Sequence, residues 1–340
     1  MSHFTVLVIG DNPEEKLAPY QENNMGDCPE QYLEFIDETE YVEDLVERPL
    51  SGSYYKDNYP EWVGKTHGEF YLHKLQNDEE AQEGFEKNNG IKVEDASELD
   101  AVAFLNCGFT ARRNENGNIH YGYGANPNSK WDWYQLGGRW KGNFLPKEEA
   151  SGNSGSPGIF GNQGREGWVD QIRKGDVDWD KMREIKKQEL HDQYDKYEAK
   201  LASNDVLTEE QVNTYLDWWD KNEYPNKNIN RTPQDDHDSV DEFIQARRQY
   251  ICARDTGIIS ILETENDVLS REEYVDQYKV FSSYAVIDHS GEWYEPGEMG
   301  WFGCSSANND EVREFKRSVF ETWIKPLPDN TLLSVYDCHI

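Results

Sequence analysis

Basic side chains are scarce in this sequence of 340 residues. Lys and Arg number 34 against 67 Asp and Glu, which gives a formal net charge of −33. A surface of this sign repels phosphates, so the balance argues against direct nucleic-acid binding and against adsorption to an anionic membrane. The sequence also lacks an apolar run of about 18 residues, and its start, MSHFTVLVIG, lacks the basic region and cleavage site of a signal peptide. These absences predict a soluble, intracellular protein.

Cysteine is scarce as well, and no two cysteines form a C-x-x-C pair. An odd number at wide spacing argues against a zinc site and favours reduced thiols. The five are Cys28, Cys107, Cys252, Cys304 and Cys338. If the terminal strands pair, His3 meets Asp337, Cys338 and His339, but adjacent strand residues point to opposite faces, so Cys338 and His339 do not readily share a site. The sequence assigns no catalytic residue, no metal and no cofactor, and a binding protein is preferred over an enzyme.

Low apolar content with high net charge is also the signature of a disordered chain. The aromatic residues argue against disorder, because 11 Trp, 20 Tyr and 13 Phe make up 13% of the sequence. Each buried ring removes about 150–250 Å² from water. The sequence therefore predicts a folded protein with aromatic cores.

The acidic residues are concentrated in two stretches. Residues 1–100 have a net charge of −18 and residues 201–300 one of −14, whereas residues 101–150 have +2. This patterning indicates a partner-facing surface more than uniform solvation. The candidate partner-facing acids are Glu38, Glu40, Glu43, Asp44, Asp235, Asp236, Asp238, Asp241 and Glu242.

The order of predicted elements indicates an antiparallel-rich α+β fold with a helical insertion in the middle. Strand patterns at residues 3–10 and 331–340, next to helical patterns, permit a ferredoxin-like sheet built from both chain ends. Residues 1–160 and 255–340 then form one discontinuous domain, and residues 165–252 form a mainly helical arm. Helical patterns within that arm cover residues 179–201, 209–222 and 239–251.

Three further patterns define the expected domain more closely. The apolar run 101–107 predicts a strand that faces residues 119–124 across the hairpin signal Asn116-Gly117. Glycine and serine in residues 151–167 predict a flexible loop that acts as a hinge or boundary. Residues 256–263 predict a strand that follows the arm.

The segment WDWYQLGGRW, residues 131–140, is the candidate ligand site. On a strand Trp131 and Trp133 share a face, and Gly137-Gly138 lets the backbone turn or approach another group closely. With Arg139 and Trp140, the two rings could sandwich a base while the guanidinium holds a phosphate. The alternative is an aromatic core strand with a glycine bulge. The candidate ligand-binding residues are Trp131, Trp133, Arg139 and Trp140.

Several long motifs resemble a family of tailed-bacteriophage proteins that has no assigned activity. They are SHFTVLVIGDNPEEKLAPY at the start, NPNSKWDWYQLGGRW, VDQIRKGDVDWDKMRE, GEWYEPGEMGWFG and LPDNTLLSVYDCHI at the end. The matches follow one another in order along nearly the whole chain. The resemblance implies a phage accessory protein of the bacterial host cytoplasm, and it implies no catalytic residue.

Three functional hypotheses follow. The first is an acidic inhibitor that occupies the basic nucleic-acid groove of a host protein, such as a nuclease or another part of an anti-phage defence complex, as a DNA mimic. The second is a nucleotide-binding protein, either a signal sponge or a metal-dependent hydrolase, that uses residues 131–140. The third is a structural protein that its charge keeps in solution. A homo-oligomer is compatible with each of them.

Overall fold

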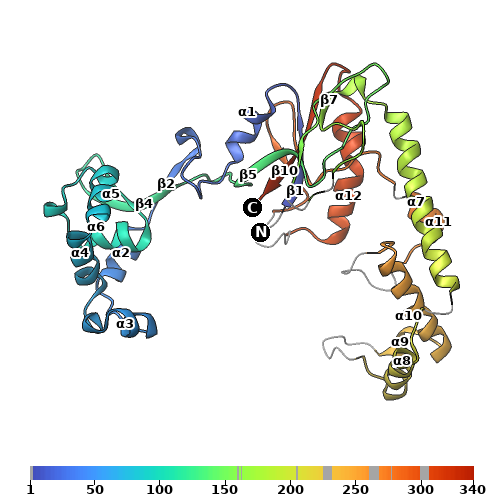
Figure 1. Cartoon of the computed structure of the whole chain (residues 1–340), viewed down its shortest axis with the longest axis horizontal. Coiled ribbons are helices and arrows are strands. Elements are labelled where there is room, and N and C mark those ends of the chain that lie inside the picture. The colour runs from blue at the N-terminus through green and yellow to red at the C-terminus, as the bar shows by residue number, and fades with distance from the viewer. Residues whose placement is uncertain are drawn as a thin grey trace. The chain divides into compact units, whose positions relative to one another are not determined.

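The computed structural model describes residues 3–158, 161, 163–203, 206–224, 232–259, 268–276, 278–298 and 306–340. Figure 1 shows the chain and labels most of its helices and several of its strands. The chain forms two compact units: unit 1 is Met1–Pro13 with Tyr134–Cys338, and unit 2 is Glu14–Trp133 with His339–Ile340. Both units contain helices and a sheet, which confirms the α+β class. The division differs from the expected one, because residues 14–133 form cores of their own.

The sheet of unit 1 has the strand order β6-β5-β10-β1-β8-β9, and β7 also pairs with β10. These strands are β1 (His3–Ile9), β5 (Trp133–Gly138), β6 (Ser156–Pro157), β7 (Gln171–Arg173), β8 (Ala285–Ile287), β9 (Trp293–Tyr294) and β10 (Leu332–His339). The first strand, β1, lies beside the last, β10, so the expectation that both chain ends build the sheet is confirmed (Figure 1). The sheet is mixed, because β1 runs parallel to β8 with Val6 opposite Ala285. A ferredoxin-like sheet has antiparallel neighbours, so the topology departs from that expectation.

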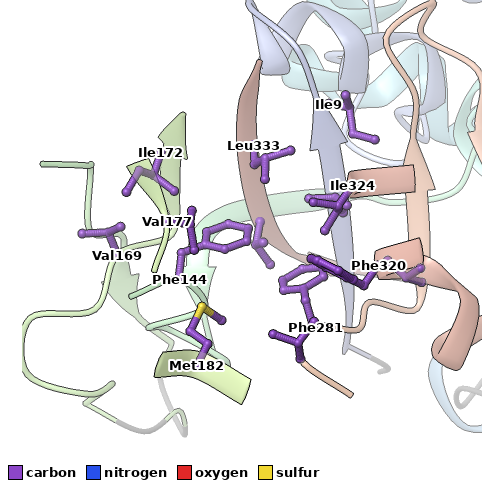
Figure 2. Packing of buried hydrophobic residues seen from close by; sticks show 14 of the residues in the cluster. Ile9, Phe144, Val169, Ile172, Val177, Met182, Phe281, Phe320, Ile324 and Leu333 are labelled. Carbon is purple, nitrogen blue, oxygen red and sulfur yellow. The ribbon is translucent and has the colours of Figure 1, made fainter. Parts of the chain in front are cut away.

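The core of unit 1 is mainly aliphatic, with a few aromatic rings packed inside it (Figure 2). Phe144 stacks on Phe281 with 5.1 Å between the ring centroids. Trp179 contacts both Phe144 and Phe320, at 6.0 and 4.9 Å. Phe320 follows α12 (Asn309–Val319) in a π-helical turn, Phe320–Ile324. The expectation of an aromatic core is met only in part, because Leu, Ile, Val and Met make up most of this cluster.

The predicted helices of unit 1 are present. In the arm they are α7 (Trp179–Ala202), α8 (Glu209–Lys221) and α10 (Val240–Asp255), and the short helices α9 (Pro233–Asp236) and α11 (Arg271–Asp276) were not predicted. The first turns of α7 contribute Met182 to the core beneath the sheet, and its later turns pack Tyr194 and Tyr197 against Cys252 and Tyr274. One long helix therefore contributes to two separate cores. Of the expected strand 256–263, residues 256–259 form a turn and the rest lies outside the described residues.

Unit 2 packs short helices on a small antiparallel sheet with the order β2-β4-β3. Its elements are α1 (Pro13–Leu17), β2 (Glu34–Asp37), α2 (Thr39–Val46), α3 (Ser53–Asn58), α4 (His67–Asn77), α5 (Glu79–Asn89), α6 (Glu98–Val102), β3 (Thr110–Arg113) and β4 (Ile119–Ala125). Single 3₁₀ turns lie at Ala18–Tyr20, Glu30–Tyr32, Pro60–Trp62 and Val93–Asp95 in this unit and at Lys174–Asp176 in unit 1. Val42, Leu45 and Val46 of α2 pack against Val102 and Tyr121.

The expected strand 101–107 is wrong, although the hairpin next to it is confirmed. Residues 101–107 complete α6 and continue as a π-helical turn, Ala103–Cys107. Ser97 begins α6 with a capping box, in which its hydroxyl accepts the Asp100 N–H. The true partner of β4 is β3, with Ala111 opposite Tyr121. A short apolar run has the same sequence pattern whether it forms a strand or a helix, and here the capping box favours the helix.

Candidate functional site

The four candidate ligand residues divide between the two units. Trp131 and Trp133 belong to unit 2, whereas Arg139 and Trp140 belong to unit 1. Trp131 is only 3% exposed, and its indole N–H donates to the Leu17 carbonyl at 3.2 Å. Its ring is therefore part of a core and offers no face on which a base could stack. The expected sandwich of two rings around a base is not built.

Trp133 is 40% exposed, but its ring already has a stacking partner. The His339 ring lies 5.2 Å away at an interplanar angle of 18°. His339 Nδ1 lies 2.6 Å from Asp132 Oδ1, and the Asn24 amide donates to Asp132 Oδ2 at 3.3 Å. The hydrogen bond to the carboxylate fixes the imidazole orientation, so this set positions the Trp133 ring.

In unit 1 the Arg139 backbone is fixed by a buried carboxylate. Asp337 is fully buried in β10, and its Oδ2 accepts the Arg139 N–H at 2.9 Å. Its Oδ1 lies 2.8 Å from His3 Nδ1, which confirms that pairing of the terminal strands brings His3 to Asp337. Trp140, the next residue after Arg139, is 38% exposed.

A second fully buried carboxylate, Asp170, fixes the other side of this turn. It accepts the N–H of Gly142 at 2.7 Å and that of Asn143 at 3.2 Å, and the Asn143 amide at 2.8 Å. It also accepts the Gly155 N–H at 2.9 Å. Four N–H donors occupy its oxygens, so Asp170 joins two chain segments and is not placed to abstract a proton. Sequence reasoning missed this residue, because a lone Asp beside a short strand carries no motif.

The two aspartates explain the Gly-Gly pair. Gly137 and Gly138 have φ values of 73° and 54°, in the region that favours glycine. A Cβ at Gly137 would lie 2.5 Å from Asp170 Oδ2, and one at Gly138 would lie 2.2 Å from the Asp337 Cβ. The glycines therefore admit buried carboxylates of the protein itself, and the close approach expected from the motif is to them.

The same crowding explains the glycine-rich loop. A Cβ at Gly155 would lie 1.9 Å from the Leu136 carbonyl oxygen, and one at Gly161 would lie 2.7 Å from the Arg139 Cα. Backbone thus packs on backbone, and β6 pairs with β5 at Gly137 and Ser156. The expected boundary at residues 151–167 is wrong, because this segment lies inside unit 1.

The arrangement around Asp337 does not form a nucleophile and base. Cys338 is fully buried, and burial raises the pKa of its thiol well above the usual range, so the thiol stays protonated at neutral pH. Within the residues that the structure describes, no group of three or more His, Cys, Asp or Glu side chains could hold a metal ion. We assign no catalytic residue to this constellation.

The candidate acids near the N-terminus lie on or beside α2. Glu40, Glu43 and Asp44 are exposed and Glu38 is half-buried. Glu40, Glu43 and Asp44, with Glu47 at the C-cap, follow the spacing i, i+3, i+4 and i+7, which puts these four carboxylates on one face of the helix. Asp44 pairs with Arg48.

The candidate acids of the second group lie at the starts of α9 and α10. Asp235, Asp236, Asp238, Asp241 and Glu242 are all exposed. Asp235 Oδ2 accepts the Thr232 N–H at 2.8 Å, and Glu242 Oε2 accepts the Asp238 N–H at 2.8 Å. Two of the five therefore satisfy backbone N–H groups at helix ends, which is a structural role.

Comparisons with protein-family models, with curated proteins and with solved structures find no match at the level of significance required. In the described part of the chain, no helix combines the length and the apolar composition that crossing a membrane requires. The candidate function must therefore be argued from the residues themselves.

Proposed function

We propose that the protein acts by binding, as an acidic inhibitor that occupies the basic nucleic-acid groove of another protein. The observation that carries this proposal is the acidic face of α2: Glu40, Glu43, Asp44 and Glu47. Neighbouring side chains on such a face have Cβ atoms about 5–6 Å apart. A row of carboxylates at this spacing presents to Lys and Arg side chains a field like that of a phosphate backbone.

The charge of unit 2 supports the same proposal. Residues 14–133 contain 26 acidic and 10 basic side chains, a net charge of −16. A field of this size steers a cationic partner toward the unit, and it weakens as salt is added.

The buried face of α2 fixes the orientation of the helix, and so of its acidic face. Val42, Leu45 and Val46 are buried in the core of unit 2, so packing fixes which side chains point outward. Tyr41, on the same helix, is 47% exposed. Tyrosine is enriched in protein interfaces, where a rigid ring adds contact area at low entropy cost. An exposed ring among carboxylates fits a docking face better than a face that only maintains solubility.

The proposed setting is the host cytoplasm, with the protein acting as a phage accessory protein. This part rests on the resemblance of the motifs to tailed-bacteriophage proteins. The partner would be a host protein that acts on nucleic acid, such as a nuclease or a defence complex, because such proteins carry basic grooves. We do not propose nucleotide binding by residues 131–140, since Trp131 is buried and the Trp133 ring stacks on His339.

Capture of host proteins on the immobilised full-length chain tests the proposal. We expect a bound protein at about 0.1 M salt that elutes at about 0.5 M salt and is displaced by duplex DNA, since exposed charges are screened as salt rises. Its activity on DNA should fall when the chain is added back. A partner that ignores both salt and DNA, or the absence of any partner, would count against the proposal.

A further inference from the structure

A compact loop of unit 2, residues 51–65, is described by the structure throughout and has no buried residue. Its two ends are joined, because the Leu50 N–H donates to the Lys65 carbonyl at 2.7 Å and the Gly64 N–H donates to the Leu50 carbonyl at 3.2 Å. The loop contains α3 and the 3₁₀ turn Pro60–Trp62. Surface loops whose ends are close together are frequently functional. We call residues 51–65 the aromatic loop, because Tyr and Trp are its largest side chains.

Ring-to-ring contacts hold the aromatic loop on the rest of unit 2. Phe70 of α4, which is 5% exposed, lies at the centre of these contacts. The ring centroids of Tyr55, Tyr59 and Trp62 lie 5.8, 5.0 and 5.4 Å from that of Phe70, at interplanar angles of 86°, 68° and 71°. Such edge-to-face contacts are favourable. The three residues are nevertheless only half-buried, so packing on Phe70 does not cover them fully.

Tyr54 is the most exposed aromatic residue of the loop, at 61%. Its ring centroid lies 5.3 Å from that of Tyr55 and 6.1 Å from that of Tyr59. Figure 1 shows α3, which carries Tyr54, at one end of unit 2. Val63 is a further exposed apolar side chain, and the two acidic residues of the loop balance its two basic ones. An exposed aromatic surface without net charge is typical of the centre of a protein interface.

The aromatic loop adjoins the acidic face of α2. His67, at the start of α4, connects the two: its backbone N–H donates to the Arg48 carbonyl at 3.0 Å, and its Nδ1 lies 2.8 Å from the same oxygen. Arg48 directly follows Glu47 and pairs with Asp44. The His67 ring in turn lies 6.0 Å from that of Tyr55. Exposed carboxylates and exposed rings are therefore neighbours within unit 2.

Aromatic rings of unit 2 already accept cations on their faces. The Lys65 ammonium lies 4.1 Å from the centre of the Trp62 ring, and the Arg112 guanidinium lies 4.7 Å from that of Phe35. The positive charge is attracted by the electron-rich face of the ring. A cationic side chain of a partner can use the same attraction at an exposed ring such as Tyr54.

We infer that the aromatic loop and the acidic face of α2 together bind an arginine-rich segment of the partner. The inference rests on the proposed function, in which the partner is basic, and it specifies the cation. A planar guanidinium stacks on an aromatic ring and pairs with a carboxylate through two N–H groups, whereas the ammonium of lysine is compact and strongly hydrated. A surface that offers both rings and carboxylates therefore favours arginine. A second copy of this chain is the less suitable occupant, because each unit 2 has a net charge of −16.

Titration of the full-length chain with two synthetic peptides, nona-arginine and nona-lysine, at about 0.15 M salt tests the inference. We expect nona-arginine to bind at least about tenfold more tightly than nona-lysine. Tyr54→Leu should weaken the binding of nona-arginine about threefold, as the loss of one exposed cation–π contact does, and that of nona-lysine less than about twofold. Tyr54→Phe keeps the ring and should bind both peptides as the unchanged chain does.

A second tyrosine of the same unit provides the matched control. Tyr123 lies on β4 and is 42% exposed, so Tyr123→Leu removes a comparable ring outside the aromatic loop and should leave both affinities unchanged. Equal affinities for the two peptides would overturn the inference. Equal effects of Tyr54→Leu and Tyr123→Leu, or no binding of nona-arginine, would also overturn it.

The peptide titrations and the host-protein capture fail independently. A host protein that is captured in a salt-sensitive and DNA-competed way, while the two peptides bind equally, would overturn the inference and support the proposed function. Preferential binding of nona-arginine that Tyr54→Leu weakens, without any captured host protein, would support arginine recognition by this surface and count against the proposed function.

Discussion

Carboxylates lie both at the Gly137–Gly138 turn and on helix α2, but those at the turn are buried and those on α2 are exposed. At the turn Asp170 and Asp337 are fully buried, and N–H donors occupy their oxygens. On α2 the carboxylates of Glu40, Glu43, Asp44 and Glu47 point to solvent. The difference teaches that the more distinctive motif serves the fold, while the plainer acidic helix leaves its carboxylates exposed to solvent.

The largest expected loss of stability comes from a substitution that disrupts the Gly137–Gly138 turn. Gly138→Ala places a Cβ 2.2 Å from that of Asp337 at a φ of 54°, so we expect a loss of about 3 kcal/mol in the free energy of unfolding. The control is Gly167→Ala, where φ is 78° but no atom lies within 4 Å; it should cost only about 1 kcal/mol. Urea unfolding followed by Trp fluorescence measures both. Equal costs would show that Asp337 does not crowd the turn.

A second change separates the two kinds of carboxylate. Asp170→Asn places an amide among four N–H donors, and leaving one of them unpaired should cost about 2–3 kcal/mol. Glu43→Gln on α2 should stay within about 0.5 kcal/mol of the unchanged protein, as exposed positions do. The same unfolding experiment compares them. Similar losses in the free energy of unfolding at both positions would contradict the distinction between buried, hydrogen-bonded carboxylates and exposed ones.

The smallest expected effect is on how the free energy of unfolding depends on pH. Burial raises the pKa of the Cys338 thiol, so the stability it contributes is complete below the unfolded pKa of about 8.5 and is lost as pH rises above it. The loss should approach about 1.4 kcal/mol for each pH unit above that value. In Cys338→Ala this contribution to the slope of unfolding free energy against pH should disappear. Urea unfolding midpoints measured from pH 7 to 10 test this. An unchanged slope would mean that the thiol ionises in the folded state.

Much of the fold was predictable from local signals. The buried strand 3–10, the arm helices and the closing strand all follow from apolar patterning and appear in the structure. The run 101–107 misled because seven mostly apolar residues are too few to distinguish a period of two residues from one of 3.6. The division into units could not be read from composition, because its breaks after Pro13 and after Trp133 fall inside α1 and β5 and not in a linker.

The candidate site was predictable only in part. The sequence indicated that Gly137-Gly138 allows a close approach, but not that Asp170 and Asp337 are the approaching groups, since they lie 33 and 200 residues beyond Gly137. The acids of α2 were found by counting charge.

One measurement tests the central claim most directly: the affinity of the captured host protein for a chain with an uncharged α2 face. The variant carries Glu40→Gln, Glu43→Gln, Asp44→Asn and Glu47→Gln. A control makes the same change in charge at exposed acids of unit 1: Glu148→Gln, Glu149→Gln, Glu166→Gln and Glu184→Gln. We predict that the α2 variant binds at least about a hundredfold more weakly, from about 0.7 kcal/mol at each of four positions, and that the control changes affinity less than about fivefold. Equal weakening of the two variants would contradict the account.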